Sequence, residues 1–412
     1  MPDSDSDLAY KMYERQKRLT LWDQDIVDSS SVLIVGVGGT GCEALKNLAL
    51  AGVGNITIID SDVVEISNLN RQLSFRAGDV GKPKVSAAKK FVHSLNPLVT
   101  VRAMKARIED VGTRVFEEAD VVLGCLDNRP SREYVNEICV LLKKPLVDSG
   151  TEGYLGRVQT VLPGKTACLS CGGYTFKEVT KSVEPCTLVG EPRRQQDCAW
   201  IALNTFYIEH DREPDETSLR DVSEILQIAN RVARKYGFEP LTEKEVKNII
   251  LYKVPNIISV TSVIGAIQAQ EVLKIIHLQK RNRLKKKEKA NFKKLLESSR
   301  FHIPGLTVYN GLTGYFITED LKVDPDCPVC SKKPKVLNVV VRADEKFSAL
   351  FDGLGKGFTP EETLITKSHI VVFDPTKTDL LDRKVGSLLN DDLLRVSNLN
   401  SDKQVFVRLR IE

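Results

Sequence analysis

The chain has 412 residues, which is long enough for two or three domains with substantial hydrophobic cores. It contains 59 lysines and arginines against 55 aspartates and glutamates, a net charge of +4. Nine basic residues and one glutamate fall within 280–294, so this run carries +8 and the rest of the chain about −4, which argues against a nucleic-acid-binding protein.

The N-terminal segment and the longest apolar segment exclude two further classes of protein. Residues 1–11 are acidic and polar, so we expect no secretory signal peptide there. Residues 257–278 are strongly apolar but include two glutamines, a glutamate and a lysine, which indicates a core helix rather than a membrane span. We therefore expect a cytoplasmic protein that does not contact a membrane.

The first predicted element is a helix over 8–30. Tyr10, Tyr13, Leu19 and Trp22 recur there near helical spacing, so one side of this helix is expected to pack on a sheet. Its basic side chains are Lys11, Arg15, Lys17 and Arg18.

The next stretch combines a strand, a glycine turn, a helix and a second strand that ends in an acid. These elements are the apolar run 32–35, the turn Gly36-Val-Gly38-Gly39-Thr-Gly41, the helix 42–51 and the run 56–59 before Asp60. This order is typical of the nucleotide-binding half of a doubly wound α/β fold. Glycines let the backbone approach a polyphosphate, and the helix N-terminus offers free N–H groups. Asp60 is placed to accept a hydrogen bond from a ribose hydroxyl, yet the motif alone fits NAD or FAD as well as ATP.

Further alternation of helices and strands continues this fold class. We expect a helix over 85–94 and parallel strands over 99–104, 120–125 and 145–148. Asp127 follows the second of these strands, and ligands in open α/β sheets bind outside the carboxyl ends of the strands. A carboxylate beside a phosphate-binding loop suits Mg²⁺, although an Asx-turn or helix cap before 131–133 would explain Asp127 as well.

Two cations lie just beyond the second strand. Arg71 and Lys84 would add positive charge to a site that already has a helix N-terminus. A dinucleotide-binding dehydrogenase seldom needs this charge, whereas an enzyme that cleaves ATP must stabilise the leaving pyrophosphate. The pattern therefore favours nucleotidyl transfer.

Together these motifs resemble the ubiquitin-activating enzyme superfamily, which includes the molybdopterin- and thiamine-pathway adenylyltransferases. The resemblance rests on the glycine turn, Asp60, Asn68-Leu-Asn-Arg71-Gln72, Lys84 and Leu126-Asp127-Asn128. It implies that Asp60 holds the ribose, that Asn68, Arg71 and Lys84 contact the triphosphate, and that Asp127 holds Mg²⁺. The nucleotide-binding set it implies is Gly36, Gly38, Gly39, Gly41, Asp60, Asn68, Arg71, Gln72, Lys84 and Asn128. The implied reaction adenylates the C-terminal glycine of a ubiquitin-like protein and releases pyrophosphate.

The segment Tyr13-x-Arg15-Gln16 resembles the N-terminal element of the superfamily, whose arginine reaches into the ATP site of a partner subunit. Catalytic subunits of the heterodimeric SUMO- and NEDD8-activating enzymes usually lack it. We therefore expect a homodimer in which Arg15 acts in trans. The alternative is that Arg15 is a solvated helix residue.

The segment Glu184-Pro185-Cys186-Thr187 resembles the catalytic-cysteine segment of the SUMO- and NEDD8-activating subunits. By this resemblance Cys186 and Thr187 join the catalytic set, and the Cys186 thiolate would attack the acyl adenylate to form a thioester. Lys181, Arg193 and Arg194 would favour the thiolate, although a surface-loop cysteine is the alternative. Four other cysteines lie in apolar sequence patterns and are expected to pack in the core as small hydrophobic residues: Cys42, Cys125, Cys139 and Cys198.

Residues 175–255 are expected to form a helical insertion that carries Cys186. Its predicted helices are 219–236 and 242–252, and Thr242 with Glu245 makes a capping box at the start of the second.

Two C-x-x-C pairs, Cys168/Cys171 and Cys327/Cys330, flank the insertion. Neither pair alone completes a tetrahedral zinc site, but four pooled thiolates form a closed structural one. The superfamily places its zinc in this way. A redox C-x-x-C is the alternative.

The last 80 or so residues change in composition, and their pattern predicts a β-grasp module. Strands are expected over 336–341, 369–373 and 405–411, with a short helix over 344–354. In SUMO- and NEDD8-type enzymes this position holds a ubiquitin-fold domain that recruits the conjugating enzyme. The basic run 280–294 is expected to be a solvated loop or helix.

The predicted organisation is a Rossmann-like adenylation domain (1–174 and 256–330), a catalytic-cysteine insertion (175–255) and a ubiquitin-fold domain (335–412). The predicted function is activation of a ubiquitin-like protein with ATP, Mg²⁺ and a structural zinc ion, followed by transfer to a conjugating enzyme. A sulfur-carrier adenylyltransferase is the alternative within the fold. A scaffold subunit and an NAD oxidoreductase remain as alternatives from other classes.

Overall fold

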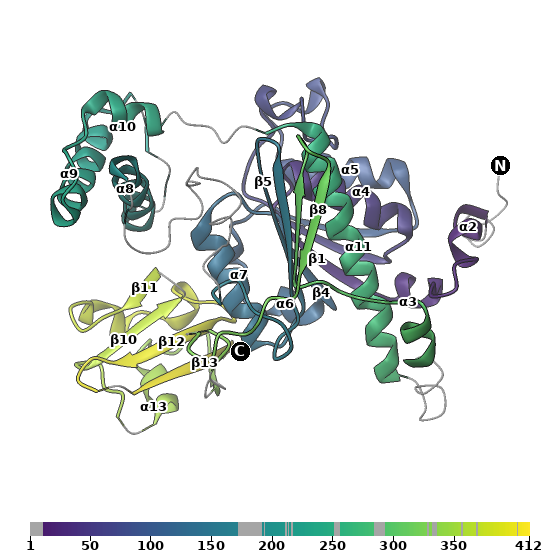
Figure 1. Ribbon diagram of the computed structural model, residues 1–412. Helices are drawn as coiled ribbons and strands as arrows, with labels where there is room; N and C mark the ends of the chain where they lie inside the picture. The colour runs from purple at the N-terminus through teal and green to yellow at the C-terminus, as the bar shows by residue number, and fades with distance from the viewer. Residues whose placement is uncertain are drawn as a thin grey trace. The chain divides into compact units, whose positions relative to one another are not determined.

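The structure is a computed structural model, which describes residues 11–171, 192, 194–210, 212, 214–215, 217–250, 256–283, 293–327, 329–331, 336–355, 357–367, 370–401 and 403–412. The chain forms two compact units (Figure 1). The first comprises Met1–Cys171 with Asn256–Glu412, and the second is Gly172–Pro255.

The first unit contains an 8-stranded sheet with the order β3-β2-β1-β4-β5-β6-β7-β8. Its strands are β1 (Ser31–Val35), β2 (Asn55–Ile59), β3 (Thr100–Met104), β4 (Val121–Gly124), β5 (Leu146–Glu152), β6 (Leu155–Val161), β7 (Leu306–Asn310) and β8 (Tyr315–Glu319). The strands from β3 to β5 pair in parallel, and β6 to β8 add antiparallel pairs. This confirms the doubly wound α/β fold, in which continuous apolar runs form strands buried on both faces.

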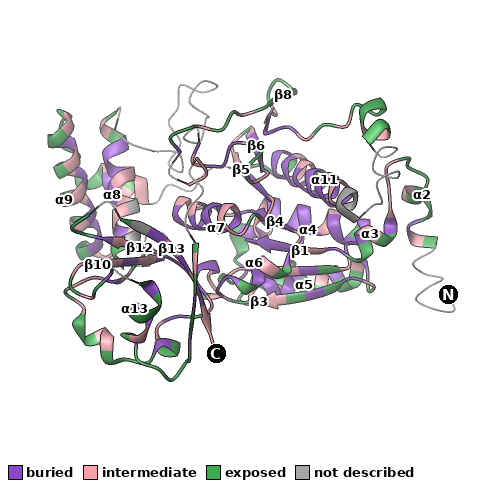
Figure 2. Cartoon of the chain, turned by 90° about the horizontal axis from the view of Figure 1, so that it is seen from below, coloured by how far each residue is buried: buried purple, intermediate pink, exposed green. Residues whose placement is uncertain are grey.

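Helices lie before and between these strands along the chain, and most of them pack against the sheet. They are α2 (Glu14–Lys17), α3 (Gln24–Asp28), α4 (Gly39–Ala51), α5 (Lys84–Leu95), α6 (Arg114–Glu118), α7 (Arg129–Leu141) and α11 (Ile258–Arg283), with 3₁₀ turns at Ile66–Asn68, Ala77–Asp79 and Ile108–Asp110. Helix α11 runs against α4, and Gly265 permits the close approach because an added Cβ would lie 2.6 Å from the Glu43 Cβ. Figure 2 shows buried residues concentrated along the central strands, α4 and α11. The described helices include none with the length and apolarity needed to cross a bilayer.

The prediction of one helix over 8–30 is wrong. Helix α2 ends at Lys17, and a new helix, α3, starts after Asp23. The Asp23 side chain caps α3 by accepting the Ile26 N–H, and the Asp23 N–H donates to His277 Nε2 of α11 at 3.0 Å. Both contacts need a non-helical backbone at Asp23, so tertiary packing interrupts the helical pattern. The predicted burial of Tyr13 is confirmed, but the residue lies at the ends of α4 and α5 and not on the sheet: its hydroxyl accepts a hydrogen bond from Asn96, the C-cap of α5.

The first unit also contains a 5-stranded sheet with the order β11-β10-β12-β13-β9. Its elements are β9 (Val336–Val341), α13 (Ala349–Leu354), β10 (Thr363–Lys367), β11 (Ile370–Phe373), β12 (Leu393–Asn398) and β13 (Gln404–Ile411), with 3₁₀ turns at Thr378–Asp382 and Val385–Ser387. The first and last strands are parallel neighbours, and α13 packs against β9. This C-terminal sheet (β9–β13 with α13) agrees with the predicted β-grasp pattern. The helix begins later than predicted, and β10 and β12 are additional strands.

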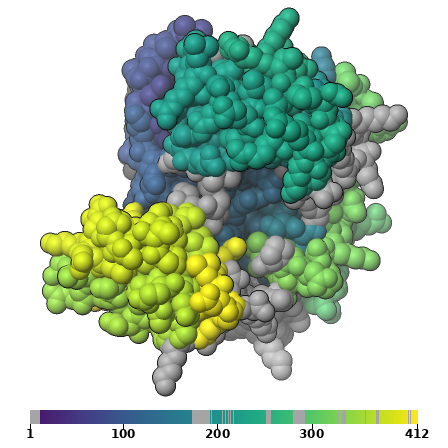
Figure 3. All heavy atoms as spheres, turned by 90° about the vertical axis from the view of Figure 1, so that its left-hand side faces the viewer, coloured from purple at the N-terminus to yellow at the C-terminus, as the bar shows by residue number. Residues whose placement is uncertain are grey.

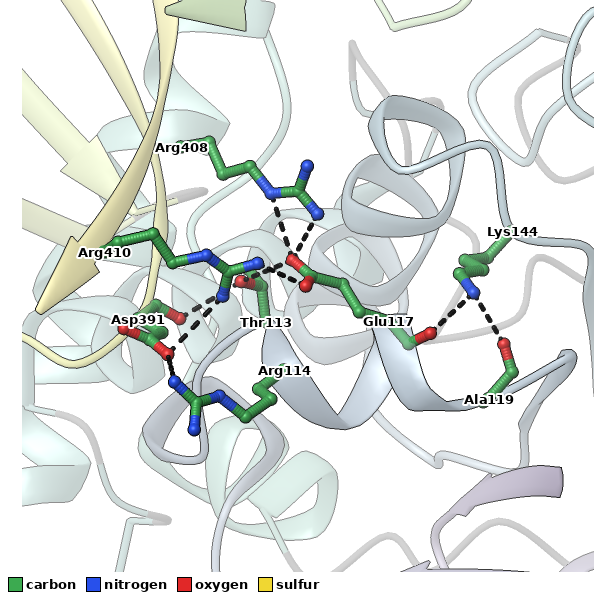
Figure 4. A network of polar contacts seen from close by, with 8 residues as sticks. All are labelled: Thr113, Arg114, Glu117, Ala119, Lys144, Asp391, Arg408 and Arg410. Carbon is green, nitrogen blue, oxygen red and sulfur yellow. Dashed lines mark hydrogen bonds and ion pairs between the residues drawn. The ribbon is translucent and has the colours of Figure 1, made fainter. Parts of the chain in front are cut away.

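The C-terminal sheet is joined to the rest of the first unit by charged side chains (Figure 4). Glu117 of α6 accepts from Arg408 and Arg410 of β13. Asp391 pairs with Arg114 at 2.7 Å and with Arg410 at 3.4 Å, and its carbonyl accepts the Thr113 N–H at 2.6 Å.

The second unit is helical in its described part. It contains α8 (Gln195–His210), α9 (Leu219–Tyr236) and α10 (Glu243–Ile250), which form a small core that includes Phe206, Ile225 and Val246. The capping box is confirmed, because the Thr242 N–H donates to the Glu245 carboxylate at 2.7 Å and the Glu245 N–H donates to the Thr242 hydroxyl at 3.3 Å. This unit gives the teal surface in Figure 3.

Candidate active site

The carboxyl ends of β1, β2 and β4 lie at one edge of the large sheet. Strand β1 pairs in parallel with both neighbours, so Val35 lies level with Ile59 and with Gly124. Strand order reverses here, because the chain continues outward from β1 to β2 on one side and from β4 to β5 on the other. Such a reversal opens a crevice where ligands bind. The glycine turn, Asp60 and Asp127 all follow these strand ends.

Two glycines of the turn are required by the fold. Gly36 has φ of +91°, and an added Cβ would lie 2.5 Å from the Cys125 carbonyl oxygen. A Cβ on Gly41 would lie 2.2 Å from the Gly36 carbonyl oxygen. On Gly39, the Cβ would meet the Thr261 side chain at 3.2 Å.

Gly38 differs from these residues because nothing lies within 4 Å of the position that its Cβ would occupy. It is the N-cap of α4 and has no side chain with which to satisfy the first N–H groups of the helix. The space before this helix N-terminus is therefore open and lined by N–H donors, which suits a phosphate group.

Asp60 and Lys84 lie beside the turn and are linked by charge. The Asp60 carboxylate accepts the Val37 N–H at 2.7 Å and the Asp62 N–H at 2.8 Å, which holds the turn in place. Burial raises the pKa of Asp60, and the nearby Lys84 opposes this. Lys84 is buried and its Nζ lies 2.7 Å from Asp62 Oδ2. Burial lowers the pKa of Lys84, but Asp60, Asp62 and Asp127 outweigh this and raise it overall.

The residues of the Asn-Leu-Asn-Arg-Gln motif take different positions. Asn68 is buried, and its Oδ1 accepts the Glu65 N–H at 2.9 Å, which caps a 3₁₀ turn. Arg71 donates from Nη1 to the Ser67 carbonyl at 2.6 Å. Gln72 is 4% exposed, and its Oε1 has no hydrogen-bond partner among the described residues. A buried acceptor of this kind is rare and indicates that a donor belongs there.

Asp127 lies exposed at the loop between β4 and α7. The helix cap considered for Asp127 is made by Asn128 instead, whose Oδ1 accepts the Ser131 N–H at 3.0 Å. Asp127 contributes to the raised pKa of Lys84, so the two side chains are close enough to interact by charge. An accessible carboxylate beside an open phosphate-binding turn has the chemistry that Mg²⁺ requires.

Four cysteines from distant parts of the first unit gather in one cluster. The Sγ of Cys168 lies 3.6 Å from that of Cys327 and 3.8 Å from that of Cys171, and the Sγ atoms of Cys171 and Cys330 are 3.0 Å apart. All four Sγ atoms lie within 4.8 Å of one another. Tetrahedral zinc with Zn–S bonds of about 2.3 Å needs sulfur atoms about 3.8 Å apart, so the cluster fits this ion.

Three predicted catalytic residues remain, of which the structure describes Arg15. Arg15 lies exposed on α2, and within the part of the chain that the structure describes its side chain makes no hydrogen bond or ion pair. Cys186 and Thr187 lie outside the described residues. The predicted burial of Cys42, Cys125, Cys139 and Cys198 is confirmed. Burial raises the pKa of Cys42 to about 11 and of Cys125 to about 12, so these thiols are not nucleophiles.

One buried residue next to the crevice is missing from the predicted set. Arg132 of α7 donates to the Asp148 carboxylate, to the Ser149 carbonyl and to the Leu126 carbonyl just before Asp127. The sequence does not distinguish it from the neighbouring charged residue Glu133, because the partners of Arg132 lie on other elements.

Comparisons with known proteins match this chain to a family model and to several relatives. The model of the ThiF family matches residues 13–306. The NEDD8-activating enzyme E1 catalytic subunit of Arabidopsis thaliana is 35% identical, over 61% of this chain and 59% of that protein. The subunit of the same name from Dictyostelium discoideum is 31% identical, over 73% of this chain and 68% of that protein.

Two further matches are a SUMO-activating enzyme subunit and a solved structure. SUMO-activating enzyme subunit 2 of Dictyostelium discoideum is 39% identical, over 43% of this chain and 27% of that protein. A crystal structure of E. coli MccB with MccA-N7isoASN has a TM-score of 0.52 at 20% identity, over 78% of this chain and 75% of that one, and supports the fold. This chain covers less than two thirds of the length of the Arabidopsis relative. The resemblance to the ubiquitin-activating enzyme superfamily is confirmed, and the chain belongs to the ThiF family.

Proposed function

We propose that this protein activates a ubiquitin-like protein, using ATP to adenylate its C-terminal carboxylate and then forming a thioester on Cys186. The observation that carries the proposal is the convergence of an open glycine turn, Asp60, Lys84 and Asp127 at the edge formed by β1, β2 and β4. This edge combines a phosphate cradle, a ribose acceptor, a cation and an accessible carboxylate. The similarity to NEDD8- and SUMO-activating subunits supports the same activity.

The first step would occur at the glycine turn. An oxygen of the substrate carboxylate attacks the α-phosphorus of ATP, a new P–O bond forms, and the bond to the β-phosphate breaks with release of pyrophosphate. Lys84 and Arg71 would stabilise the negative charge that develops on the leaving group, with Asn68 beside them. Asp60 would hold the ribose, and Asp127 would hold Mg²⁺, which neutralises phosphate charge when bound. Gln72 and Asn128 complete the proposed nucleotide site.

The second step would occur at Cys186. Its thiolate attacks the acyl carbon of the adenylate, so that a C–S bond forms, the acyl–phosphate bond breaks and AMP leaves. Cys186 and Thr187 fall in a different unit from the glycine turn, so we propose that a movement between the units brings the thiol to the adenylate. The C-terminal sheet would then receive the conjugating enzyme to which the acyl group passes.

Three further assignments belong to this proposal. The four-cysteine cluster would bind a structural zinc ion. The exposed guanidinium of Arg15 would complete the ATP site of a partner copy, which makes the protein a homodimer. The protein would act in the cytoplasm without nucleic acid or membrane.

The test uses the full chain with ATP, Mg²⁺ and candidate ubiquitin-like proteins. We expect pyrophosphate exchange into ATP, together with a protein adduct on non-reducing gels that disappears with thiol and in Cys186→Ala. Exchange without any adduct would favour the alternative, a sulfur-carrier adenylyltransferase. If the wild-type chain neither exchanges pyrophosphate nor forms an adduct, the proposed function is wrong.

A further inference from the structure

A buried arginine connects the middle of β5 to the loop that carries Asp127. Arg132 is 7% exposed and is the fourth residue of α7. Its Nη1 donates to Asp148 Oδ2 at 2.7 Å and to the Ser149 carbonyl at 2.7 Å, and its Nη2 donates to the Leu126 carbonyl. The guanidinium therefore ties the loop after β4 to a central strand of the sheet.

These contacts restrict the loop on both sides of Asp127. The Leu126 carbonyl is part of the peptide bond that leads into Asp127, so the hydrogen bond from Arg132 fixes the plane of that bond. On the other side, Asn128 is held by the Ser131 N–H at its Oδ1 and by the Arg132 N–H at its carbonyl, at 3.0 and 3.4 Å. Asp127 is thus an exposed side chain on an anchored backbone.

Asp148, which anchors Arg132, is itself held firmly. It is 1% exposed, and its Oδ1 lies against Gly124, where an added Cβ would be 2.7 Å away. Arg157 of the neighbouring strand β6 approaches the same carboxylate, with 3.2 Å between Nη2 and Oδ2. Charge-assisted hydrogen bonds in such a buried place are strong and directional. The anchor of the loop is therefore rigid.

We infer that Arg132 is a positioning residue for the adenylation site, because it holds in place the backbone from which the Asp127 carboxylate would bind Mg²⁺. The inference rests on the proposed function and extends it to a residue that touches neither metal nor nucleotide. Residues that orient a metal ligand usually change metal affinity by 10- to 100-fold when they are replaced.

The test is the Mg²⁺ concentration needed for half-maximal ATP binding, measured by calorimetry without any ubiquitin-like protein. Arg132→Lys keeps the charge but cannot donate in three fixed directions, so we expect it to need about tenfold more Mg²⁺ than the wild type. Arg157→Lys is the matched control, since Arg157 contacts the same carboxylate from β6; its Mg²⁺ requirement should remain within about twofold.

An Arg132→Lys variant with the wild-type Mg²⁺ requirement would overturn the inference, as would an equal shift in Arg157→Lys. If Arg132→Lys does not fold, Arg132→Gln, which retains an amide donor, is measured in its place. A merely structural role would lower the melting temperature without changing the Mg²⁺ requirement. The measurement needs no substrate protein and no turnover, so a failure of the inference (ATP binding with an unchanged Mg²⁺ requirement in Arg132→Lys) is distinguishable from a failure of the proposed function (a wild type without pyrophosphate exchange).

Discussion

At the scale of single residues, the glycine turn separates the requirements of folding from those of binding. Gly41→Ala places a Cβ 2.2 Å from the Gly36 carbonyl oxygen, so it should destabilise the fold by about 3 kcal/mol or more. Gly38→Ala places its Cβ in open space and should stay within about 1 kcal/mol of the wild type. Its methyl group would occupy the phosphate approach, so ATP affinity should fall by roughly tenfold or more.

Urea unfolding and ATP titration of the two variants measure these effects separately. A Gly38→Ala chain that binds ATP as tightly as the wild type would contradict a phosphate position in front of α4.

The residues of the crevice could be predicted where they follow a strand. The carboxyl ends of parallel strands lie at one edge of the sheet, whatever the sequence of the rest of the chain. Asp60 and Asp127 are of this kind, and Lys84 joins them by its charge coupling to both. Arg132 could not be predicted in the same way. Its partners are a carboxylate on β5 and two backbone carbonyls, and these contacts exist only after the sheet has formed.

At the scale of elements, the strands with apolar runs were predictable and those with polar inward positions were not. Strand β10 turns Thr363, Ile365 and Lys367 inward, so its alternation is not hydrophobic. Lys367 is buried because it pairs with Asp392 at 2.7 Å, a contact that no local pattern reveals. Helix α8 was not predicted, because its apolar residues are spread around most of the helix instead of forming one stripe. An amphipathic stripe, as in α9, is what makes a helix visible in a sequence.

The cysteine cluster joins two elements that are far apart in the sequence, the segment after β6 and the segment after β8. We expect one zinc ion per chain, because the four thiols satisfy one tetrahedral ion. Cys327→Ser should lose the metal and lower the melting temperature by roughly 5–10 °C, since the ion crosslinks the two segments.

Metal analysis and thermal unfolding measure both effects. Cys139→Ser serves as the control, because Cys139 is buried in α7 outside the cluster and its variant should keep the zinc. A wild-type chain without metal that forms disulfides within these pairs would instead support the redox alternative.

At the scale of the whole first unit, charged side chains connect the C-terminal sheet to the core. Arg408 and Arg410 alternate along β13 so that both point to Glu117, and Asp391 lies between Arg410 and Arg114 (Figure 4). Lys144 donates to the Glu117 and Ala119 carbonyls at 2.7 and 2.8 Å, which fixes the end of α6. Such a connection depends on ionisation as well as on packing.

This connection predicts a dependence of stability on pH. Burial raises the pKa of Glu117, but the two arginines outweigh it and lower the pKa below its usual value. A carboxylate with a lowered pKa stabilises the fold above its ordinary pKa, and that stability is lost as the pH falls through the lowered value. Glu117→Gln should therefore cost about 1–2 kcal/mol at neutral pH, and the difference from the wild type should shrink as the pH falls below about 4.

Glu118→Gln is the control, because its pair with Arg102 is half exposed and should contribute under about 0.5 kcal/mol at either pH. Urea unfolding at neutral pH and below about pH 4 measures these differences. If Glu117→Gln has the same cost at both, the ionisation of Glu117 does not hold the C-terminal sheet to the core.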